Sequence, residues 1–526
     1  MRNLMNRSLL RFSALACAAA VLAAAPPPPP GKPRLILAIA VDQFRWEYLH
    51  RFQDGYTSGF KRLLSQGAVF ENAHYVHYPT VTAVGHSTFL SGALPSVSGI
   101  VGNEWYDRET GKTTTSVSDS ATQLVGATGT GSSPRKLLVS TVGDEIKMSG
   151  QESRVVGVSI KDRSAILPAG HMADGAYWFD NKSAQWVTST YYTKALPAWV
   201  EKANAAHPDA KSINAVWTSL EGGKPLCTMG EPKDGIGKCP SLEASPWGNE
   251  MIEEFAETAL AGEKLGQHKG TDILAVSFSA NDYVGHAVGP DSPEVRDISL
   301  RTDRLLGKLL DAVDKSVGLD RVLVVLTADH GVSSVPEVNE ARRMIGGRLP
   351  ISAVTKAVND ALGAKYGPSR WVESASGSNV YLNWELIEYK KLDLAEVQRI
   401  AARAAAKVPH VFRAYSADQI QSGQISTEAV DAAIRNGFYG PRAADVVILQ
   451  DPYYLIGAGG ETSGTTHSTP FSYDTHVPVI FMGAGVHAGR YFDKVTVNDI
   501  APTLSAIVGV TEPSGAMGRV LLEMWQ

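Results

Sequence analysis

The stretch "RLILAIAV" (residues 34–41), which Asp42 follows, decides the fold class. Three further apolar runs share its character: "DILAVSF" (272–278), "RVLVVLTA" (321–328) and "VPVIFMGAG" (477–485). Near-continuous apolar runs are typical of strands that are buried on both faces, as in a parallel sheet covered by helices. Apolar residues at helix-face spacing in residues 294–317 predict one covering helix. We therefore predict an α/β fold in which a mostly parallel central sheet lies between helix layers.

Acidic residues and histidines follow the first three runs. Asp42 follows the first run, Asp282 and His286 the second, and Asp329 and His330 the third. In open α/β sheets, functional sites lie outside the carboxyl ends of the strands. Asp282 and His286 are four residues apart in "NDYVGH", so one helical turn would place both on the same side. An isolated Asp-His pair is usually a solvated turn, but three clusters after three strands indicate a site with ligands for two zinc-like ions.

The whole chain fits one large domain. Its 526 residues suit a single α/β core, residues 34–526, that carries insertions at about 165–255 and 337–435. The second insertion reads helix, strand, helix, strand, as in a small α+β lid. The formal net charge of −5 is spread without long single-sign runs, which predicts neither a nucleic-acid partner nor a membrane-surface partner.

The N-terminus predicts export. Three arginines precede an apolar run at 12–25 that is too short to span a bilayer comfortably, and small residues near its end offer a cleavage site. We expect a signal peptide at residues 1–25, a Pro-rich linker at 26–33, and a periplasmic or secreted protein without a membrane span. Lipid attachment at Cys17 is the less favoured alternative, because Ala14 stands where a lipobox has leucine.

Two cysteines remain after export. Cys227 and Cys239 bracket a Gly-, Lys- and Pro-rich stretch. In an oxidising compartment we expect a disulfide between them; two free buried thiols are the alternative. Two cysteines are too few for a thiolate zinc site, so a metal ion would need histidines and carboxylates.

Six motifs together resemble a known family. In chain order they are "PTVTAVGH", "GNEWYD", "SIKDRSAIL", "NDYVGHAVGPDS", "TADHGV" and "THSTPFSYDTHVP". They are similar to the alkaline phosphatase superfamily, and more narrowly to the phosphate-irrepressible bacterial alkaline phosphatases with a threonine nucleophile. The resemblance runs from about Leu35 to the C-terminus and implies a site with two Zn²⁺ ions. It implies one ion held by Asp282, His286 and His467, and another held by Asp42, Asp329, His330 and the oxygen of Thr82.

The resemblance also identifies a nucleophile. In this family the nucleophile lies four residues before the histidine of "TAVGH", which makes it Thr82 rather than Thr80. A dication and the positive end of a helix would both favour the Thr82 alkoxide. We interpret Thr80 as a helix cap and His86 as a structural residue behind the site, with a metal-ligand role for His86 as the alternative.

Further residues match the positions that hold phosphoryl oxygens in the threonine-type monoesterases. They are Asn103, Lys161 and Arg163. On an extended segment, the spacing of Lys161 and Arg163 would put both cations on one side, where they suit a dianion. A solvated "KDR" loop is the alternative interpretation.

The last motif departs from the family pattern. Family members often carry glycine after the late metal histidine, whereas this chain has Ser468, and a second histidine, His476, follows. We retain His467 as the ligand because His476 immediately precedes a buried strand. Asp474 and Tyr473 are candidates for orienting this segment.

These residues predict an exported, zinc-dependent alkaline phosphatase that hydrolyses small phosphate monoesters through a phosphothreonine and acts as a monomer. The alternative in chemistry is a nucleotide phosphodiesterase or pyrophosphatase on the same two-metal core, which would not need Lys161 and Arg163. A sulfatase is disfavoured because "TVTAVGH" lacks its Cys/Ser-x-Pro-x-Arg context. Export argues against a phosphomutase, and the lack of predicted transmembrane helices argues against a phosphoethanolamine transferase. A non-catalytic metal-binding protein is the alternative from a different class.

Overall fold

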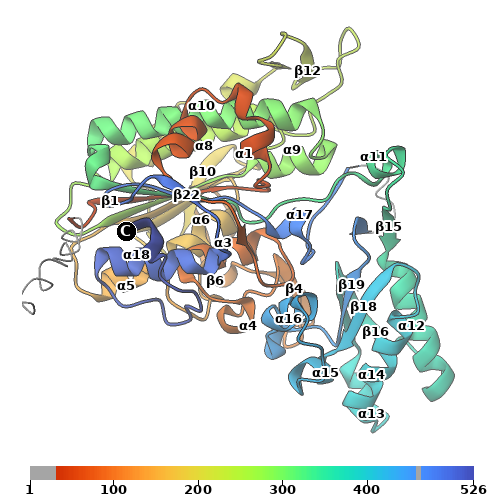
Figure 1. Ribbon diagram of the computed structural model, residues 1–526. Coiled ribbons are helices and arrows are strands. Elements are labelled where there is room, and N and C mark those ends of the chain that lie inside the picture. Colours follow the sequence, from red (N-terminus) through yellow and green to blue (C-terminus); the bar gives the residue numbers. More distant parts are fainter. Residues whose placement is uncertain (1–30, 458–463, 526) are drawn as a thin grey trace, which may run out of the picture.

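An eleven-stranded sheet forms the centre of the protein (Figure 1). The computed structural model describes residues 31–457 and 464–525. Across the sheet the order of strands is β22 (Gly489–Tyr491), β2 (Ala68–Phe70), β21 (Val479–Gly483), β14 (Val322–Thr327), β1 (Leu35–Val41), β13 (Asp272–Phe278), β8 (Val155–Ser159), β9 (Gly175–Asp180), β10 (Gln185–Ser189), β6 (Ser118–Val125) and β7 (Thr130–Ser132).

The middle of this sheet is parallel, as the apolar runs predict. β14, β1, β13, β8 and β9 are parallel neighbours. Every residue of β1, β13 and β14 is buried, because helices cover both faces. The prediction of an α/β fold with a parallel central region is therefore confirmed, and the sheet as a whole is mixed because β21, β10, β6 and β7 join it by antiparallel pairing.

The fourth apolar run differs from the other three. β21 is antiparallel to β14, and its first residue, Val479, pairs with Thr327 at the carboxyl end of β14. The segment before β21 therefore lies at the edge of the sheet where β14 ends. This direction explains why polar residues precede the fourth run, whereas they follow the first three.

Two helix layers enclose the sheet (Figure 1). On one face lie α8 (Pro246–Gly262), α9 (Ala280–Val288) and α10 (Pro293–Ser316), and on the other lie α3 (Thr82–Ser91), α5 (Val142–Met148), α6 (Asp162–Ala169) and α18 (Ile500–Val508). The helix predicted at 294–317 is α10, which turns Ile298, Leu306 and Val313 into the core.

A smaller unit, residues 347–457, stands beside the main sheet, and we call it the cap (Figure 1). Its four-stranded sheet has the order β16 (Val372–Ser376), β17 (Asn379–Leu382), β19 (Val446–Gln450) and β18 (Val411–Ser416). Its helices are α12 (Ile351–Tyr366), α13 (Trp384–Tyr389), α14 (Leu394–Ala405), α15 (Ala417–Gln421) and α16 (Ala429–Asn436). The helix–strand–helix–strand order expected for this part of the chain is that of α12, β17, α14 and β18. β19, which completes the sheet, lies beyond residue 435.

The stretch at 165–255 has two structural parts. β9 and β10 belong to the central sheet itself. The other part includes a hairpin of β11 (Val216–Thr218) and β12 (Pro225–Thr228), which projects beyond the helices in Figure 1.

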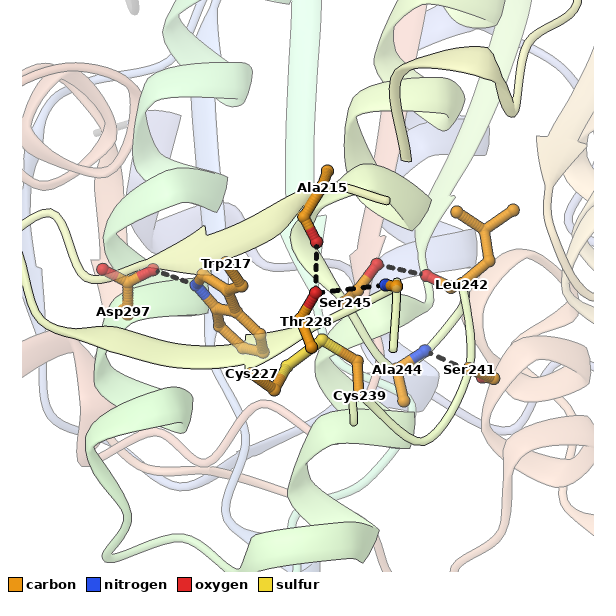
Figure 2. The surroundings of a disulfide bond; sticks show 11 residues. Ala215, Trp217, Cys227, Thr228, Cys239, Ser241, Leu242, Ala244, Ser245 and Asp297 are labelled. Atoms are coloured by element: carbon orange, nitrogen blue, oxygen red, sulfur yellow. Dashed lines mark hydrogen bonds between the residues drawn. A yellow bond between two sulfur atoms is a disulfide. The ribbon is translucent and has the colours of Figure 1, made fainter. Parts of the chain in front are cut away.

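The predicted disulfide is present in this hairpin region. Cys227 is bonded to Cys239, and Trp217 lies next to the pair (Figure 2). Nε1 of Trp217 donates a hydrogen bond of 2.6 Å to Asp297 of α10. The indole therefore fastens the hairpin to the helix layer.

Some predictions fall outside the described residues. These are the signal peptide at 1–25, Cys17, and the linker at 26–33 except for its last three residues. Among the helices of the described ranges, none has the length and apolar character needed to cross a membrane.

Candidate active site

The three strand-end clusters meet at one edge of the sheet. β1, β13 and β14 end in register, with Val41 opposite Phe278 and Ala40 opposite Thr327. Asp42 and Asp329 therefore emerge side by side, and Asp282 follows in the first turn of α9. All three carboxyl groups are buried. The parallel register thus concentrates three acids from distant parts of the chain.

Three histidines share one orientation. In each, Nδ1 donates to a backbone carbonyl: His286 to Thr465 (2.8 Å), His330 to Gly331 (2.9 Å) and His467 to Thr80 (2.7 Å). A proton fixed on Nδ1 leaves the lone pair of Nε2 free. Metal-binding histidines are oriented in this way by hydrogen bonds from the other ring nitrogen.

The Nε2 atoms and the acids lie close together. Nε2 of His286 is 3.2 Å from Nε2 of His467 and 3.2 Å from Oδ1 of Asp282. His467 is 3.7 Å from the same oxygen. The ring of His330 stacks on that of His467 at 3.5 Å, and ligand atoms of Asp282, His330 and His467 lie within 4.8 Å of one another. His330 is thus also within reach of the Asp282 group.

The second acid group contains Asp42 and Asp329. Their carboxylates and His86 offer atoms within 4.8 Å of one another, and Nε2 of His330 is 3.3 Å from Oδ2 of Asp329. Oδ2 of Asp329 and Nε2 of His330 are buried without a hydrogen-bond partner among the described residues. Burying polar atoms without a hydrogen-bond partner costs free energy unless a further group binds them. A metal ion fits that requirement.

The charges of the cluster also favour added cations. Lys161 is a buried ammonium that bridges Asp42 (3.0 Å) and Asp282 (2.6 Å). One ammonium faces three carboxyl groups. Burial, together with the neighbouring Asp42, raises the pKa of Asp329 well above its usual value. Buried carboxylates need compensating positive charge, so the donor set fits two divalent ions.

Sequence reasoning missed Gln43. Its backbone N–H donates to Oδ1 of Asp329 (2.9 Å) and its Nε2 donates to Oδ1 of Asp282 (2.7 Å). It adopts a φ of 57°, which is uncommon for a residue other than glycine. Gln43 therefore orients carboxylates from two different strand ends. Its position directly after Asp42 was the available signal.

Thr82 is the first residue of α3 and is 1% exposed. The small residues of this helix have a packing reason, because a Cβ on Gly85 would lie 2.2 Å from the carbonyl oxygen of Asp329. Helix α3 therefore packs directly against the strand end that supplies Asp329. The interpretation of Thr80 as the cap is wrong: Val81 occupies the cap position, and the Thr80 hydroxyl donates to the carbonyl of Thr469 (2.9 Å).

His86 lies behind these groups and is fully buried. Its Nδ1 contacts the carbonyl of Thr82 at 2.9 Å, and its Nε2 contacts Oγ of Ser277 at 3.0 Å. Its ring nitrogens thus contact a backbone carbonyl and a serine hydroxyl, whereas Nε2 of His286 lies against Asp282 and His467. This arrangement fits a structural residue that supports the first turn of α3.

A cleft of about 560 Å³ is lined by Val81, the residue before Thr82. Asn103 and Arg163 line it, and Oδ1 of Asn103 accepts a hydrogen bond from the backbone N–H of Ala83 (2.8 Å). The Asn103 Nδ2 group remains as a donor. The nearest carboxylate to the Arg163 guanidinium is Asp162 at 3.9 Å, and Nε of Arg163 is buried without a partner among the described residues. The guanidinium is thus available for an anion.

The segment that carries Lys161 and Arg163 is not extended, which corrects the sequence prediction. Lys161 caps α6, and Arg163 lies in its first turn. The helical turn sends the two side chains to different places: Lys161 reaches the carboxylates, whereas Arg163 lines the cleft. A strand-like spacing argument fails here because β8 ends at Ser159.

The loop before β21 brings His467 to the site. The Asp474 carboxylate accepts hydrogen bonds from the N–H (2.7 Å) and hydroxyl (2.6 Å) of Thr469, and so fixes this loop. His476 lies elsewhere: its ring stacks on Trp46 at 4.6 Å, and its Nε2 contacts the carbonyl of Glu71. His467 thus lies beside His286 and Asp282, whereas His476 does not.

The fold and the site define a two-metal hydrolase of the alkaline phosphatase superfamily. Residues 36–474 match the family described as type I phosphodiesterase / nucleotide pyrophosphatase, and the chain belongs to this family. The solved structure of wild-type alkaline phosphatase PafA superposes with a TM-score of 0.88 at 35% identity, and covers 94% of this chain and 99% of that one.

Three relatives match over nearly their full lengths. Alkaline phosphatase PafA of Elizabethkingia meningoseptica is 36% identical, with 94% of each chain covered. Alkaline phosphatase PhoV of Synechococcus elongatus is 36% identical, with 94% of this chain and 93% of that protein covered. A protein of Myroides odoratus named a calcium-transporting ATPase is 34% identical, with 94% of each covered.

Proposed function

We propose that this protein is an exported, zinc-dependent alkaline phosphatase that hydrolyses phosphate monoesters by way of a phosphothreonine at Thr82. Its place among alkaline phosphatases rests on the near-full-length similarity to PafA and PhoV: the chain is a phosphoric monoester hydrolase. The observation that carries the finer proposal is the guanidinium of Arg163, which has no close carboxylate among the described residues and lines the same cleft as Val81, the residue before Thr82. Its positive charge and multiple donors suit a dianionic phosphoryl group.

Thr82 is the proposed nucleophile. It begins α3, so its hydroxyl lies at the positive end of the helix dipole. The dipole favours the alkoxide over the neutral hydroxyl. Oδ1 of Asn103 accepts from the N–H of Ala83, which leaves Nδ2 of Asn103 to donate to a phosphoryl oxygen, where charge develops during transfer.

The proposed metal ligands fall into two sets. Asp282, His286 and His467 form one, and Asp42, Asp329 and His330, with the oxygen of Thr82, form the other. Histidine and aspartate together suit zinc. When bound, two such ions stabilise the attacking and the departing oxygens of an in-line displacement. The inward Nε2 atoms of the histidines and the unpartnered oxygen of Asp329 support this assignment.

The proposed reaction has two displacements. Oγ1 of Thr82 bonds to phosphorus while the bond to the leaving oxygen breaks, and the alcohol departs with a proton from solvent. Water then attacks phosphorus, the bond to Thr82 breaks, and inorganic phosphate leaves. Arg163 and Asn103 hold the phosphoryl oxygens in both steps, while Lys161 and Gln43 keep the acids in place.

The main alternative is a nucleotide phosphodiesterase or pyrophosphatase, as the family description allows. That activity would transfer a phosphoryl group with one fewer anionic oxygen and would have less use for Arg163. We retain phosphomonoesterase because the guanidinium faces the cleft without a carboxylate within 3.5 Å among the described residues. For the same chain we propose a periplasmic or secreted location and a monomeric state.

One experiment tests the proposal. Metal content is measured on the purified protein, and hydrolysis of phenyl phosphate and bis-phenyl phosphate is compared for the wild type and Thr82→Ala. We expect zinc in both proteins, preference for the monoester, and loss of turnover in the variant. Preference for the diester would favour the phosphodiesterase instead. Zinc without any hydrolysis would favour the non-catalytic protein.

A further inference from the structure

Ser468 has a backbone conformation that glycine favours. Its φ is 103°, in a region that side chains with a Cβ rarely adopt. The neighbouring residues hold it there, since His467 is bonded to Thr80, and Thr469 is bonded to Asp474. Backbone strain that is fixed on both sides is often found at functional sites. Glycine at this position would remove the strain, so the presence of serine suggests that its side chain has a role.

The position of Ser468 indicates this role. Ser468 is half-buried and lines the same cleft as Arg163 and Asn103. It directly follows His467, which belongs to the proposed ligand set of Asp282, His286 and His467. Ser468 therefore links the wall of the cleft to this proposed ligand set through one peptide bond.

The facing wall of the cleft is polar. It includes the turn between β16 and β17 of the cap, residues 376–379, which read Ser-Gly-Ser-Asn. Glu104 and Thr115 line the mouth as well, and Oγ of Ser376 lies 3.4 Å from the Glu104 carboxylate. No aromatic ring is among the described residues that line this cleft. These walls offer hydrogen bonds rather than a stacking surface for a base or an aryl group.

We propose that Ser468 is a specificity-determining residue whose hydroxyl hydrogen-bonds a hydroxyl-bearing leaving group, as in polyol and sugar phosphates. The inference rests on the proposed phosphomonoesterase function and adds to it a class of substrate. The Glu104 carboxylate at the mouth favours the same class, because it accepts hydrogen bonds from hydroxyl groups and repels leaving groups that carry further negative charge.

The test compares two leaving groups of equal carbon count. Wild type, Ser468→Ala and Ser468→Gly are assayed for kcat/KM with glycerol 1-phosphate and with propyl phosphate, and phenyl phosphate reports basal activity. Loss of one hydrogen bond predicts that both variants lose about threefold to tenfold on glycerol 1-phosphate and less than about twofold on propyl phosphate. Ser468→Gly should also raise Tm by about 1–3 °C, because it relieves the strained backbone, whereas Ser468→Ala should not.

The controls separate the possible failures. Equal losses on glycerol 1-phosphate and propyl phosphate would overturn the inference, since the hydroxyl would then serve the phosphoryl group or the loop. Unchanged or increased turnover of glycerol 1-phosphate in both variants would overturn it too. A wild-type protein that fails to hydrolyse phenyl phosphate would refute the proposed function itself, independently of Ser468.

Discussion

Replacement of Arg163 by alanine tests the phosphoryl site most directly. The guanidinium is 3.9 Å from its nearest carboxylate, Asp162, and its buried Nε has no partner among the described residues. Little protein interaction is therefore lost on substitution, and the effect should be confined to the substrate. A bidentate pair of charge-assisted hydrogen bonds contributes roughly 3–4 kcal/mol. At about 1.4 kcal/mol per tenfold, kcat/KM for a monoester should fall by about 100- to 1,000-fold.

The assay compares phenyl phosphate with bis-phenyl phosphate on the same enzyme preparations. A diester has one fewer anionic oxygen, so Arg163→Ala should reduce its turnover by only about tenfold or less. Arg163→Lys, which keeps the charge but loses the planar pair of donors, should lie between the wild type and Arg163→Ala. Arg135→Ala is the matched control, because Arg135 is half-exposed and pairs with Asp119 outside the residues that line the cleft. Equal losses on monoester and diester would refute the assignment of Arg163.

Four further outcomes are expected. Thr82→Ala should reduce monoester turnover at least about a thousandfold while Thr82→Ser retains part of it, measured as kcat with phenyl phosphate. A zinc chelator should abolish turnover, added Zn²⁺ should restore it, and circular dichroism should report a folded protein throughout. Replacing Cys227 and Cys239 by serine removes a cross-link with a sequence separation of 12, so the free energy of unfolding in urea should fall by up to about 3 kcal/mol, with turnover unchanged. Burial and the adjacent His476 lower the pKa of His74 to about 4. Between pH 6.5 and 4 the unfolded chain therefore binds a proton that the folded chain does not, so the free energy of unfolding falls as the pH falls through this window. His74→Gln should reduce this fall in the free energy of unfolding, measured by urea unfolding at each pH.

The framework of the fold could be predicted because burial on both faces leaves a clear pattern in sequence. β1, β13 and β14 are the apolar runs themselves, and their register follows from the parallel pairing. The direction of β21 could not be predicted from the same pattern. An antiparallel strand that is also covered by helices is equally apolar, so only the tertiary path of the preceding loop decides its direction.

The convergence of the acidic clusters could be predicted because parallel strands that are buried on both faces end at the same edge of the sheet. Asp42, Asp282 and Asp329 meet as the strand ends require. The directions of individual side chains were harder to predict from the sequence. The spacing of Lys161 and Arg163 suggested a shared face, but α6 begins between them and separates their side chains. The hydroxyl of Thr80 was expected to cap α3, but tertiary contact with the loop at Thr469 takes it.

The described non-glycine residues in left-handed backbone conformations include two at the site, and each connects groups from separate elements. Gln43, with a φ of 57°, links the carboxylates of Asp282 and Asp329, which belong to different strand ends. Glycine at that position would relax the backbone but remove the side-chain donor to Asp282. Ser468, with a φ of 103°, likewise places a polar side chain where glycine would place none. Because each strained conformation costs about 1–3 kcal/mol, its retention next to proposed metal ligands favours a role in positioning acids or substrate over a role in folding.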